Sequence, residues 1–252
     1  MKKTYTDTGM CIWCEKSAPE VTFYTEPHIL PHSLGGCEIG RDVCDECNHY
    51  FGNATKGVPS INLAFKEVFG CFRMFGNNLN ENSYKRFRSA FFQYRHSEHK
   101  IKINNTFDSR AITKQFKRGL YEVFLQKYHA DTGNGNHPMF DYARKYARYG
   151  IGTPHIYYAF NNIIFETEGD EHSILNMNKE CIDDMMESGL YRFWFYGHIF
   201  YIEVLPVVYN AKGIGFLQKE ASAFLLPAVG NEKIYEFKDV MEIDFFMQRF
   251  NS

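Results

Sequence analysis

The chain has 252 residues, of which 44% are hydrophobic and 23% are charged, and its formal net charge is −2. Its 24 Phe and 17 Tyr supply enough apolar surface for a buried core, which excludes a disordered chain. It contains no run of 18 apolar residues and no apolar leader at its start, so we expect a soluble, cytoplasmic protein without a membrane span.

Residues 1–58 are rich in cysteine and poor in apolar residues, so this segment needs a cross-link or a metal to fold. It contains two Cys-x-x-Cys pairs. Each such turn presents two thiolates to one tetrahedral ion, and two turns complete a four-sulfur shell. We therefore predict a structural Zn²⁺ held by Cys11, Cys14, Cys44 and Cys47.

A redox dithiol is the alternative interpretation of a Cys-x-x-Cys pair. It requires only one pair, placed after a strand in a βαβ unit, and no such unit is predicted here. The odd total of seven cysteines and the missing export signal argue against a disulfide framework. Of the isolated Cys37, Cys71 and Cys181, the last two lie in helical patterns and are interpreted as small buried residues.

After residue 58 the hydrophobic pattern predicts a mixed α+β domain, residues 59–252. Helices are expected, in chain order, over residues 60–75, 111–128, 140–149 and 178–187. Strands are expected over residues 87–95, 100–107, 155–167, 190–205, 213–217, 221–226 and 234–237. The predicted fold class is therefore α+β, with antiparallel strands that read a substrate or form a homodimer.

Positive charge is concentrated in residues 84–118, where ten lysines and arginines stand against Glu98 and Asp108. A solvated face is the simpler interpretation, and a surface that binds a polyanion is the sharper one. Two of the predicted helices carry clustered basic residues that we expect to follow the backbone of DNA, or alternatively RNA. They are Lys114, Lys117, Arg118, Arg144, Lys145 and Arg148.

Two stretches of the first 58 residues resemble the HNH endonuclease family, in the branch with a four-cysteine zinc site. They are Glu26-Pro-His-Ile-Leu-Pro-His-Ser-Leu-Gly-Gly36 and Val43-Cys-Asp-Glu-Cys-Asn-His-Tyr-Phe-Gly52. The resemblance rests on the order of Cys pair, His-Ile-x-Pro, Gly-Gly, and Cys pair followed by Asn. Each fragment alone is a weak signal, whereas the order is specific.

The resemblance implies a ββα-metal fold, in which a hairpin and a helix hold one catalytic divalent ion, Mg²⁺ or Mn²⁺. It assigns His28 as the general base and Asn48 as a ligand of that ion, while zinc only joins hairpin to helix. The chemistry is consistent, because phosphodiester hydrolysis needs a base that is neutral near pH 7 and a hard cation with oxygen ligands.

The sequence departs from the family directly before His28, where many members carry an acidic ligand and this chain has Pro27. Because alternate residues of a strand share a face, we expect Glu26 to lie beside His28 and to supply the missing oxygen if Pro27 distorts the strand. The alternatives are an acidic ligand from elsewhere in the chain and weakened catalysis. Further candidates are Asn53, as a ligand, and Arg41 or Asp42, as groups that orient the base.

Three functions follow from these features. The first is a metal-dependent endonuclease that cuts DNA. The second is a catalytically degenerate module that binds nucleic acid without cutting it, because Pro27 has replaced a ligand. The third is a zinc-stapled domain that binds another protein. The joint presence of His28 and Asn48 favours the first, since a degenerate module needs neither.

Overall fold

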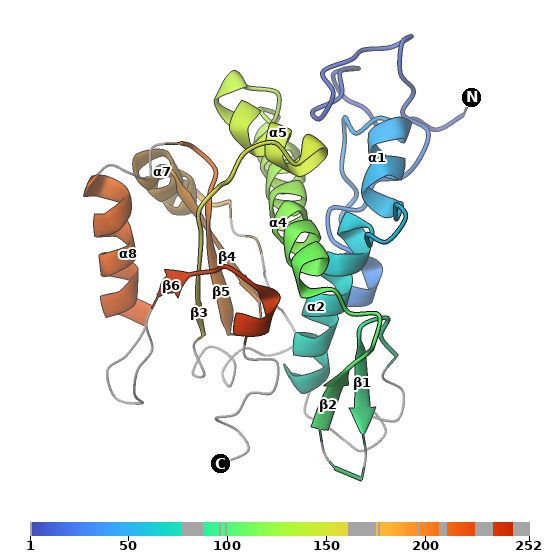
Figure 1. Ribbon diagram of the computed structural model, residues 1–252. Helices are drawn as coiled ribbons and strands as arrows, with labels where there is room; N and C mark the ends of the chain where they lie inside the picture. The colour runs from blue at the N-terminus through green and yellow to red at the C-terminus, as the bar shows by residue number, and fades with distance from the viewer. Residues whose placement is uncertain are drawn as a thin grey trace.

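The computed structural model describes residues 2–76, 88–95, 97–98, 100–160, 175, 177–195, 197–206, 211–224 and 234–243. Its long central helix, α4 (Ser109–Thr132), lies between a loop-rich amino-terminal region and a sheet (Figure 1). The mixed α+β class with antiparallel strands is confirmed. No helix in the described ranges is long and apolar enough to span a membrane.

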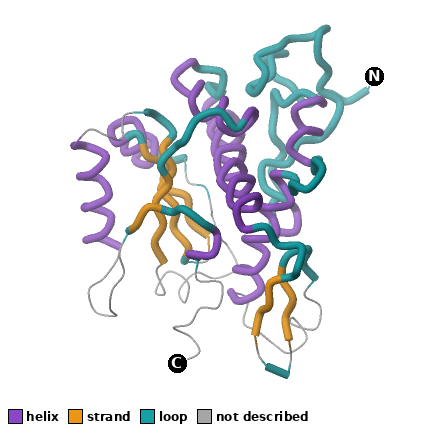
Figure 2. Tube along the Cα trace, viewed as in Figure 1, coloured by secondary structure: helices purple, strands orange, loops and turns teal. Residues whose placement is uncertain are grey.

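The amino-terminal region is mostly loop (Figure 2) and contains the 3-10 helix η1 (His32–Leu34) and helix α1 (Asp45–Gly52). Its hairpin is reduced to one antiparallel bridge between His28 and Ile39. The Gly40 N–H donates to the Pro27 carbonyl oxygen at 2.7 Å and holds the two arms together. A hairpin followed by a helix is the predicted ββα order.

Helices α2 (Ile61–Gly76) and α5 (Asp141–Tyr149) flank α4, and short η2 (Pro138–Phe140) precedes α5. The start of α2 is set by Ser60, whose hydroxyl accepts a hydrogen bond from the Leu63 N–H at 3.1 Å. Asp108 caps α4 in the same way, and Gly133 ends that helix in the left-handed conformation.

The main sheet has the strand order β4-β5-β3-β6, and every neighbouring pair is antiparallel. A separate hairpin joins β1 and β2. The strands are β1 (Phe92–Arg95), β2 (Lys100–Ile103), β3 (Ile156–Phe160), β4 (Leu190–Phe195), β5 (His198–Glu203) and β6 (Tyr235–Glu236). The remaining elements are α7 (Lys179–Ser188), α8 (Ala211–Phe224) and η4 (Val240–Glu242).

Alternate residues of the main sheet pack against different helices, as the period of a strand requires. Phe193 and Phe200 join the large core beneath α2 and α4. Their neighbours Ile199 and Tyr201 face the other way and pack with Phe216 of α8. The sheet is therefore covered on both faces.

One buried cluster crosses the predicted boundary at residue 58. It includes Trp13 and Phe51 on the amino-terminal side and Phe65 and Phe116 on the other. Trp13 packs edge-on against Phe51 with ring centroids 4.9 Å apart. The two predicted domains therefore share a hydrophobic core.

The predicted strand over residues 213–217 is wrong, because these residues belong to helix α8, as do residues 221–224. A short apolar run fits a buried helix turn as well as a strand. Phe216 and Glu220, one turn apart, face the sheet, where the Glu220 carboxylate accepts a hydrogen bond from Arg192 at 2.8 Å.

The predicted strand 190–205 is two strands, β4 and β5. Residues 87, 161–167 and 225–226, also predicted as strand, lie outside the described residues.

Candidate metal centre and active site

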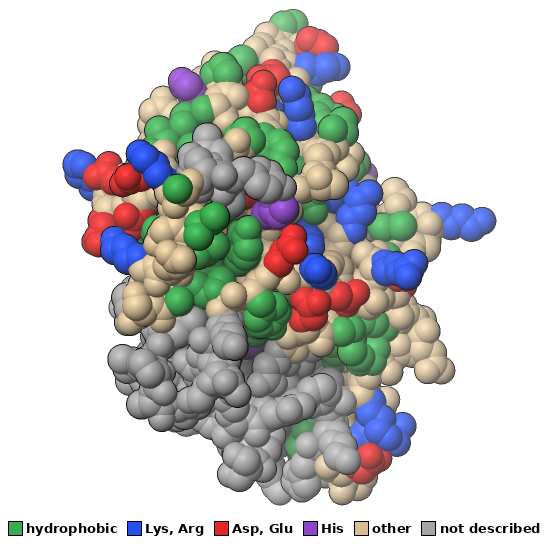
Figure 3. All heavy atoms as spheres, turned by 60° about the vertical axis from the view of Figure 1, so that its left-hand side comes forward, with side chains coloured by type: hydrophobic (Ala, Val, Ile, Leu, Met, Phe, Trp, Pro, Cys, Tyr) green, Lys and Arg blue, Asp and Glu red, His purple; other side chains and the backbone are tan. Residues whose placement is uncertain are grey.

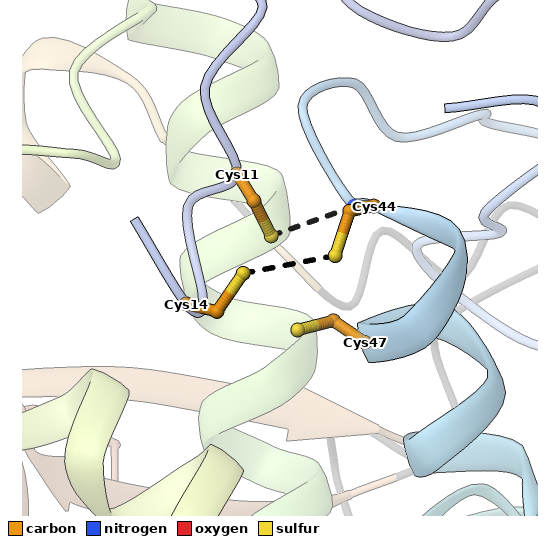
Figure 4. A group of neighbouring side chains, drawn as sticks. All are labelled: Cys11, Cys14, Cys44 and Cys47. Carbon is orange, nitrogen blue, oxygen red and sulfur yellow. Dashed lines mark hydrogen bonds between the residues drawn. The ribbon is translucent and has the colours of Figure 1, made fainter. Parts of the chain in front are cut away.

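Four cysteine side chains converge between a loop and the first turn of α1 (Figure 4). The sulfur atoms of Cys11, Cys14, Cys44 and Cys47 all lie within 4.8 Å of one another, and those of Cys14 and Cys44 are 3.7 Å apart. Zn–S bonds of about 2.3 Å in a tetrahedral shell would place sulfurs about 3.8 Å apart. The donor set and its spacing fit a structural zinc ion.

The protein already directs partial positive charge at these sulfurs. The backbone N–H groups of Trp13 and Cys44 each donate to Cys11 Sγ at 3.4 Å. Hydrogen bonds donated by the thiols of Cys44 and Cys47 lower the pKa of the Cys11 thiol. The same hydrogen bonds raise the pKa of the two donating thiols. So close a group cannot carry four thiolate charges without a cation, which is the role zinc would fill.

Helix α5 covers one side of this cysteine cage. Arg148 Nε donates to Cys47 Sγ at 3.3 Å, and the guanidinium stacks over the Tyr50 ring with 3.7 Å to its centroid. From the preceding turn, Arg144 Nε donates to the Ile12 carbonyl oxygen at 2.6 Å. Both arginines therefore hold the metal module to the rest of the chain.

Burial contradicts the predicted nucleic-acid contact for three of the six basic residues. Arg118, Arg144 and Arg148 are only 6%, 2% and 9% exposed. The guanidinium groups of Arg118 and Arg144 donate to backbone carbonyls within the protein; Arg118, for example, reaches the carbonyl oxygen of Ala147 at 2.9 Å. Arg148 donates instead to Cys47 Sγ and to the Glu46 carboxylate. The clustered charge satisfies buried acceptors instead of facing a ligand, because a guanidinium has five donors to place.

The three lysines of that set remain accessible. Lys114 and Lys145 are exposed, whereas Lys117 is half-buried, and burial lowers the pKa of its ammonium. Lys114 and Lys117 line a hollow of about 720 Å³ that is also lined by the acidic residues Glu236 and Asp239. On the face drawn in Figure 3, basic and acidic side chains are interspersed and form no field of one sign. In the 84–118 run, Arg95 and Lys102 both pair with Glu98, as in a solvated face.

The hairpin arm places Glu26 and His28 on one face and Pro27 on the other. Pro27 is buried, while Glu26 Oε1 lies 3.7 Å from His28 Nε2. The Tyr5 hydroxyl donates to the other oxygen, Glu26 Oε2, at 2.6 Å, and this hydrogen bond lowers the pKa of the Glu26 carboxyl. Glu26 is therefore an ionised, oriented carboxylate beside the imidazole.

The first turn of α1 fixes the hairpin arm against Asn48. The Asp45 carboxylate accepts from the backbone N–H groups of Tyr24 and Thr25 at 2.8 and 2.7 Å. Asn48 Nδ2 in turn donates to Thr25 Oγ1 at 3.2 Å and to the Glu26 carbonyl oxygen at 3.5 Å. These contacts orient the amide, and in the described part of the chain they leave its oxygen, Oδ1, free to coordinate an ion.

Glu26, His28 and Asn48 line one cavity of about 460 Å³. His32 lines it as well, with its ring centroid 4.2 Å from that of His28. The Nδ1 atom of His28 is shielded from solvent and has no hydrogen-bond partner among the described residues. The side chains of Glu26, Asn48 and His28 thus line one cavity that opens to solvent.

Helix α2 forms another wall of this cavity, which sequence reasoning missed. Ser60, Asn62 and Lys66 line it from outside the motif. Asn62 and Lys66 stand four residues apart in the helix predicted over residues 60–75, and this spacing was a usable signal, because such residues share a face.

The other candidates lie elsewhere. Asp42 does not orient His28; its carboxylate accepts hydrogen bonds from the Thr8 N–H at 3.1 Å and contacts His129 Nε2 at 3.0 Å. Its neighbour Arg41 pairs with Asp7. Asn53 lines a separate hollow of about 430 Å³ on the other side of α1. None of these three side chains lines the cavity of His28 and Asn48.

The family model described as HNH endonuclease matches residues 11–57. Comparisons with curated proteins and with solved structures found no match. The matched segment contains the cysteine cage, the hairpin and α1, but not the wall that α2 contributes. Residues 11–57 therefore form an HNH endonuclease module with a four-cysteine metal site.

Proposed function

We propose that this chain is a metal-dependent endonuclease that hydrolyses phosphodiester bonds of DNA, with His28 as the general base. The observation that carries the proposal is the shared cavity of His28, Glu26 and Asn48, placed beside the cysteine cage. Family resemblance of residues 11–57 supports a nuclease-type reaction, and the cavity supplies the side chains that it needs.

The proton transfer is assigned to His28 through the position of Glu26. The His28 side chain lines the cavity, but its Nδ1 atom is shielded from solvent, so a water in the cavity would meet the ring at Nε2. Glu26 Oε1 lies 3.7 Å from that nitrogen, where its negative charge would stabilise the imidazolium that forms. Nε2 would take the proton from the attacking water.

A divalent ion, Mg²⁺ or Mn²⁺, would be held by Asn48 Oδ1 and Glu26, because both offer oxygen donors at the cavity. When bound, such an ion supplies positive charge at the phosphate and the leaving oxygen. The zinc site takes no part in the reaction, and its role is to fix Asn48, which directly follows Cys47. Lys114, Lys117 and Lys145 are proposed contacts of the DNA backbone, and an RNA substrate is the alternative.

The test is cleavage of a supercoiled plasmid with Mg²⁺ or Mn²⁺, comparing wild type, His28→Ala and His49→Ala. His49 is the matched control, because it is an exposed imidazole on α1 that lines the opposite hollow. We expect His28→Ala to lower cleavage by a factor of about 10²–10⁴, the usual range for a general base, and His49→Ala to leave it unchanged. Cleavage that survives His28→Ala would refute the assignment.

The second candidate function is a degenerate module that binds DNA without cutting, and the replacement of an acid by buried Pro27 favours it. The two functions differ in one measurement. Retardation of DNA by the wild type, with no cleavage under any of Mg²⁺, Mn²⁺ or Ca²⁺, would favour the second.

A further inference from the structure

Helix α2 contributes a cation to the cavity that contains His28. Lys66 is the one Lys or Arg among the described residues that line it. The family match ends at residue 57, so this side chain belongs to the part of the chain outside the module. The candidate site is therefore composite.

Among the residues that the structure describes, the Lys66 ammonium pairs with Glu67, and it retains donors for a further ligand. Its Nζ lies 3.5 Å from Glu67 Oε1, while Glu67 Oε2 accepts from the Ser89 hydroxyl and from the Ala90 N–H. The Glu67 side chain is 8% exposed and that of Lys66 is 40% exposed. A buried, anchored carboxylate thus steadies an ammonium that still reaches solvent, and an ammonium has three donors to place.

The charge of the cavity indicates what this ammonium would bind. Glu26 is the one acidic residue among the described residues that line it. A phosphodiester brings one negative charge and gains a second as water attacks, and a fixed cation stabilises that increase. Compact ammonium groups bind phosphate oxygens as point charges, without the paired geometry that a guanidinium imposes.

We propose that Lys66 binds the phosphodiester group of the nucleic-acid substrate in this cavity. The proposal rests on the proposed function for the location of the reacting phosphate. It adds that α2 supplies a catalytic residue, so the amino-terminal module is incomplete without the following helix.

The experiment compares Lys66→Met and Lys66→Arg with the control Lys212→Met in the full chain. Lys212 is an exposed lysine of α8, which lies beyond the sheet, and it pairs with Glu187 at 3.4 Å. We expect Lys66→Met to lower kcat/KM for a short DNA duplex by a factor of about 10–1,000, mainly through kcat. Lys66→Arg should retain more of the activity than Lys66→Met, because it preserves the charge. Thermal melting of each variant checks that the fold persists.

A binding measurement separates failure of this proposal from failure of the proposed function. In a His28→Ala background, the dependence of DNA affinity on salt is measured without cleavage. Loss of one phosphate contact should reduce the slope of log K against log[salt] by about 0.9. If Lys66→Met matches Lys212→Met in both the slope and kcat/KM, the proposal is overturned while the nuclease assignment stands. If the wild type cuts no DNA, the proposed function fails. If, in addition, Lys66→Met leaves the salt slope of DNA binding unchanged, Lys66 does not bind the phosphate either.

Discussion

Arg148 Nε donates a hydrogen bond to Cys47 Sγ at 3.3 Å and so joins helix α5 to the cysteine cage across 101 residues of sequence. The same guanidinium stacks on Tyr50 of α1, which lies within one helical turn of Cys47. A charged donor to a metal-bound thiolate disperses its charge and fixes its direction. Binding of zinc and the docking of α5 would therefore be coupled.

We expect Arg148→Ala to weaken zinc binding by a factor of about 10–100, the usual effect of removing a group that supports a metal ligand. The measurement is competition with a chromogenic zinc chelator at neutral pH. Lys145→Ala is the matched control, because Lys145 lies on the same helix but is exposed. Equal affinities for the two variants would show that α5 does not support the metal.

Metal analysis of cysteine variants tests the cage itself. We expect one zinc per chain in the wild type and in Cys37→Ser, because Cys37 is exposed and lies outside the cluster. Cys44→Ser should lose the ion, since Cys44 is buried within the cluster. Structural zinc contributes roughly 10–16 kcal/mol in small zinc peptides, so this variant should also lose cooperative unfolding of the shared core. Full zinc occupancy of Cys44→Ser would contradict the site.

The parts of the site that the sequence predicts are those encoded by local spacing. The two Cys-x-x-Cys turns and the Glu26/His28 alternation depend on residues within a few positions of one another, and both appear in the structure. The α2 wall and the pairing of Asp42 with His129 join residues far apart in the chain. A local period can mark Asn62 and Lys66 as one face of a helix, but it does not encode which distant segment that face meets.

The errors in the sequence prediction have a common physical origin. Charge density along the chain does not distinguish an arginine that faces solvent from one that satisfies buried carbonyls, and Arg118 and Arg144 are of the second kind. Apolar runs are equally ambiguous, because Phe216 packs on the sheet from a helix instead of a strand. In both cases, tertiary contacts decided the outcome.

The glycine pair of the hairpin turn makes a distinct prediction for stability. Gly35 has φ +89°, and a Cβ on Gly36 would lie 2.0 Å from the Leu30 carbonyl oxygen. Because the obstacle is backbone, Gly36→Ala must displace the turn that carries His32, and we expect it to destabilise the protein by about 2–4 kcal/mol. Gly70→Ala, in α2 with nothing within 4 Å of the added carbon, should instead stabilise by about 0.5–1 kcal/mol. Urea unfolding compares the two, and similar effects would contradict the packing at Gly36.

Glu122 of α4 predicts how stability changes with pH. Burial raises the pKa of this carboxyl from 4.5 to about 8, which outweighs the nearby Arg118 charge and the hydrogen bond from Gln126 at 3.3 Å. Asn62, which lines the candidate active site, faces the same carboxyl. With its amide rotated so that the nitrogen points to Glu122, Nδ2 donates to Glu122 Oε2 at 2.8 Å. At neutral pH the protonated carboxyl supports the α2 wall.

The sign of the effect follows from where the proton is held more tightly. The unfolded chain releases it near pH 4.5 and the folded chain near pH 8, so the contribution of Glu122 is fully present below 4.5 and is lost as pH rises toward 8. Glu122→Gln cannot ionise, and we expect it to match the wild type near pH 5 and to exceed it by roughly 1–3 kcal/mol near pH 8.5. Urea unfolding at the two pH values measures the difference. Glu98→Gln is the control, because hydrogen bonds donated by Lys102 and Arg95 lower the pKa of that exposed carboxyl. If the difference in free energy of unfolding between Glu122→Gln and wild type stays constant from pH 5 to 8.5, Glu122 ionises as readily in the folded chain as in the unfolded chain, and the prediction is wrong.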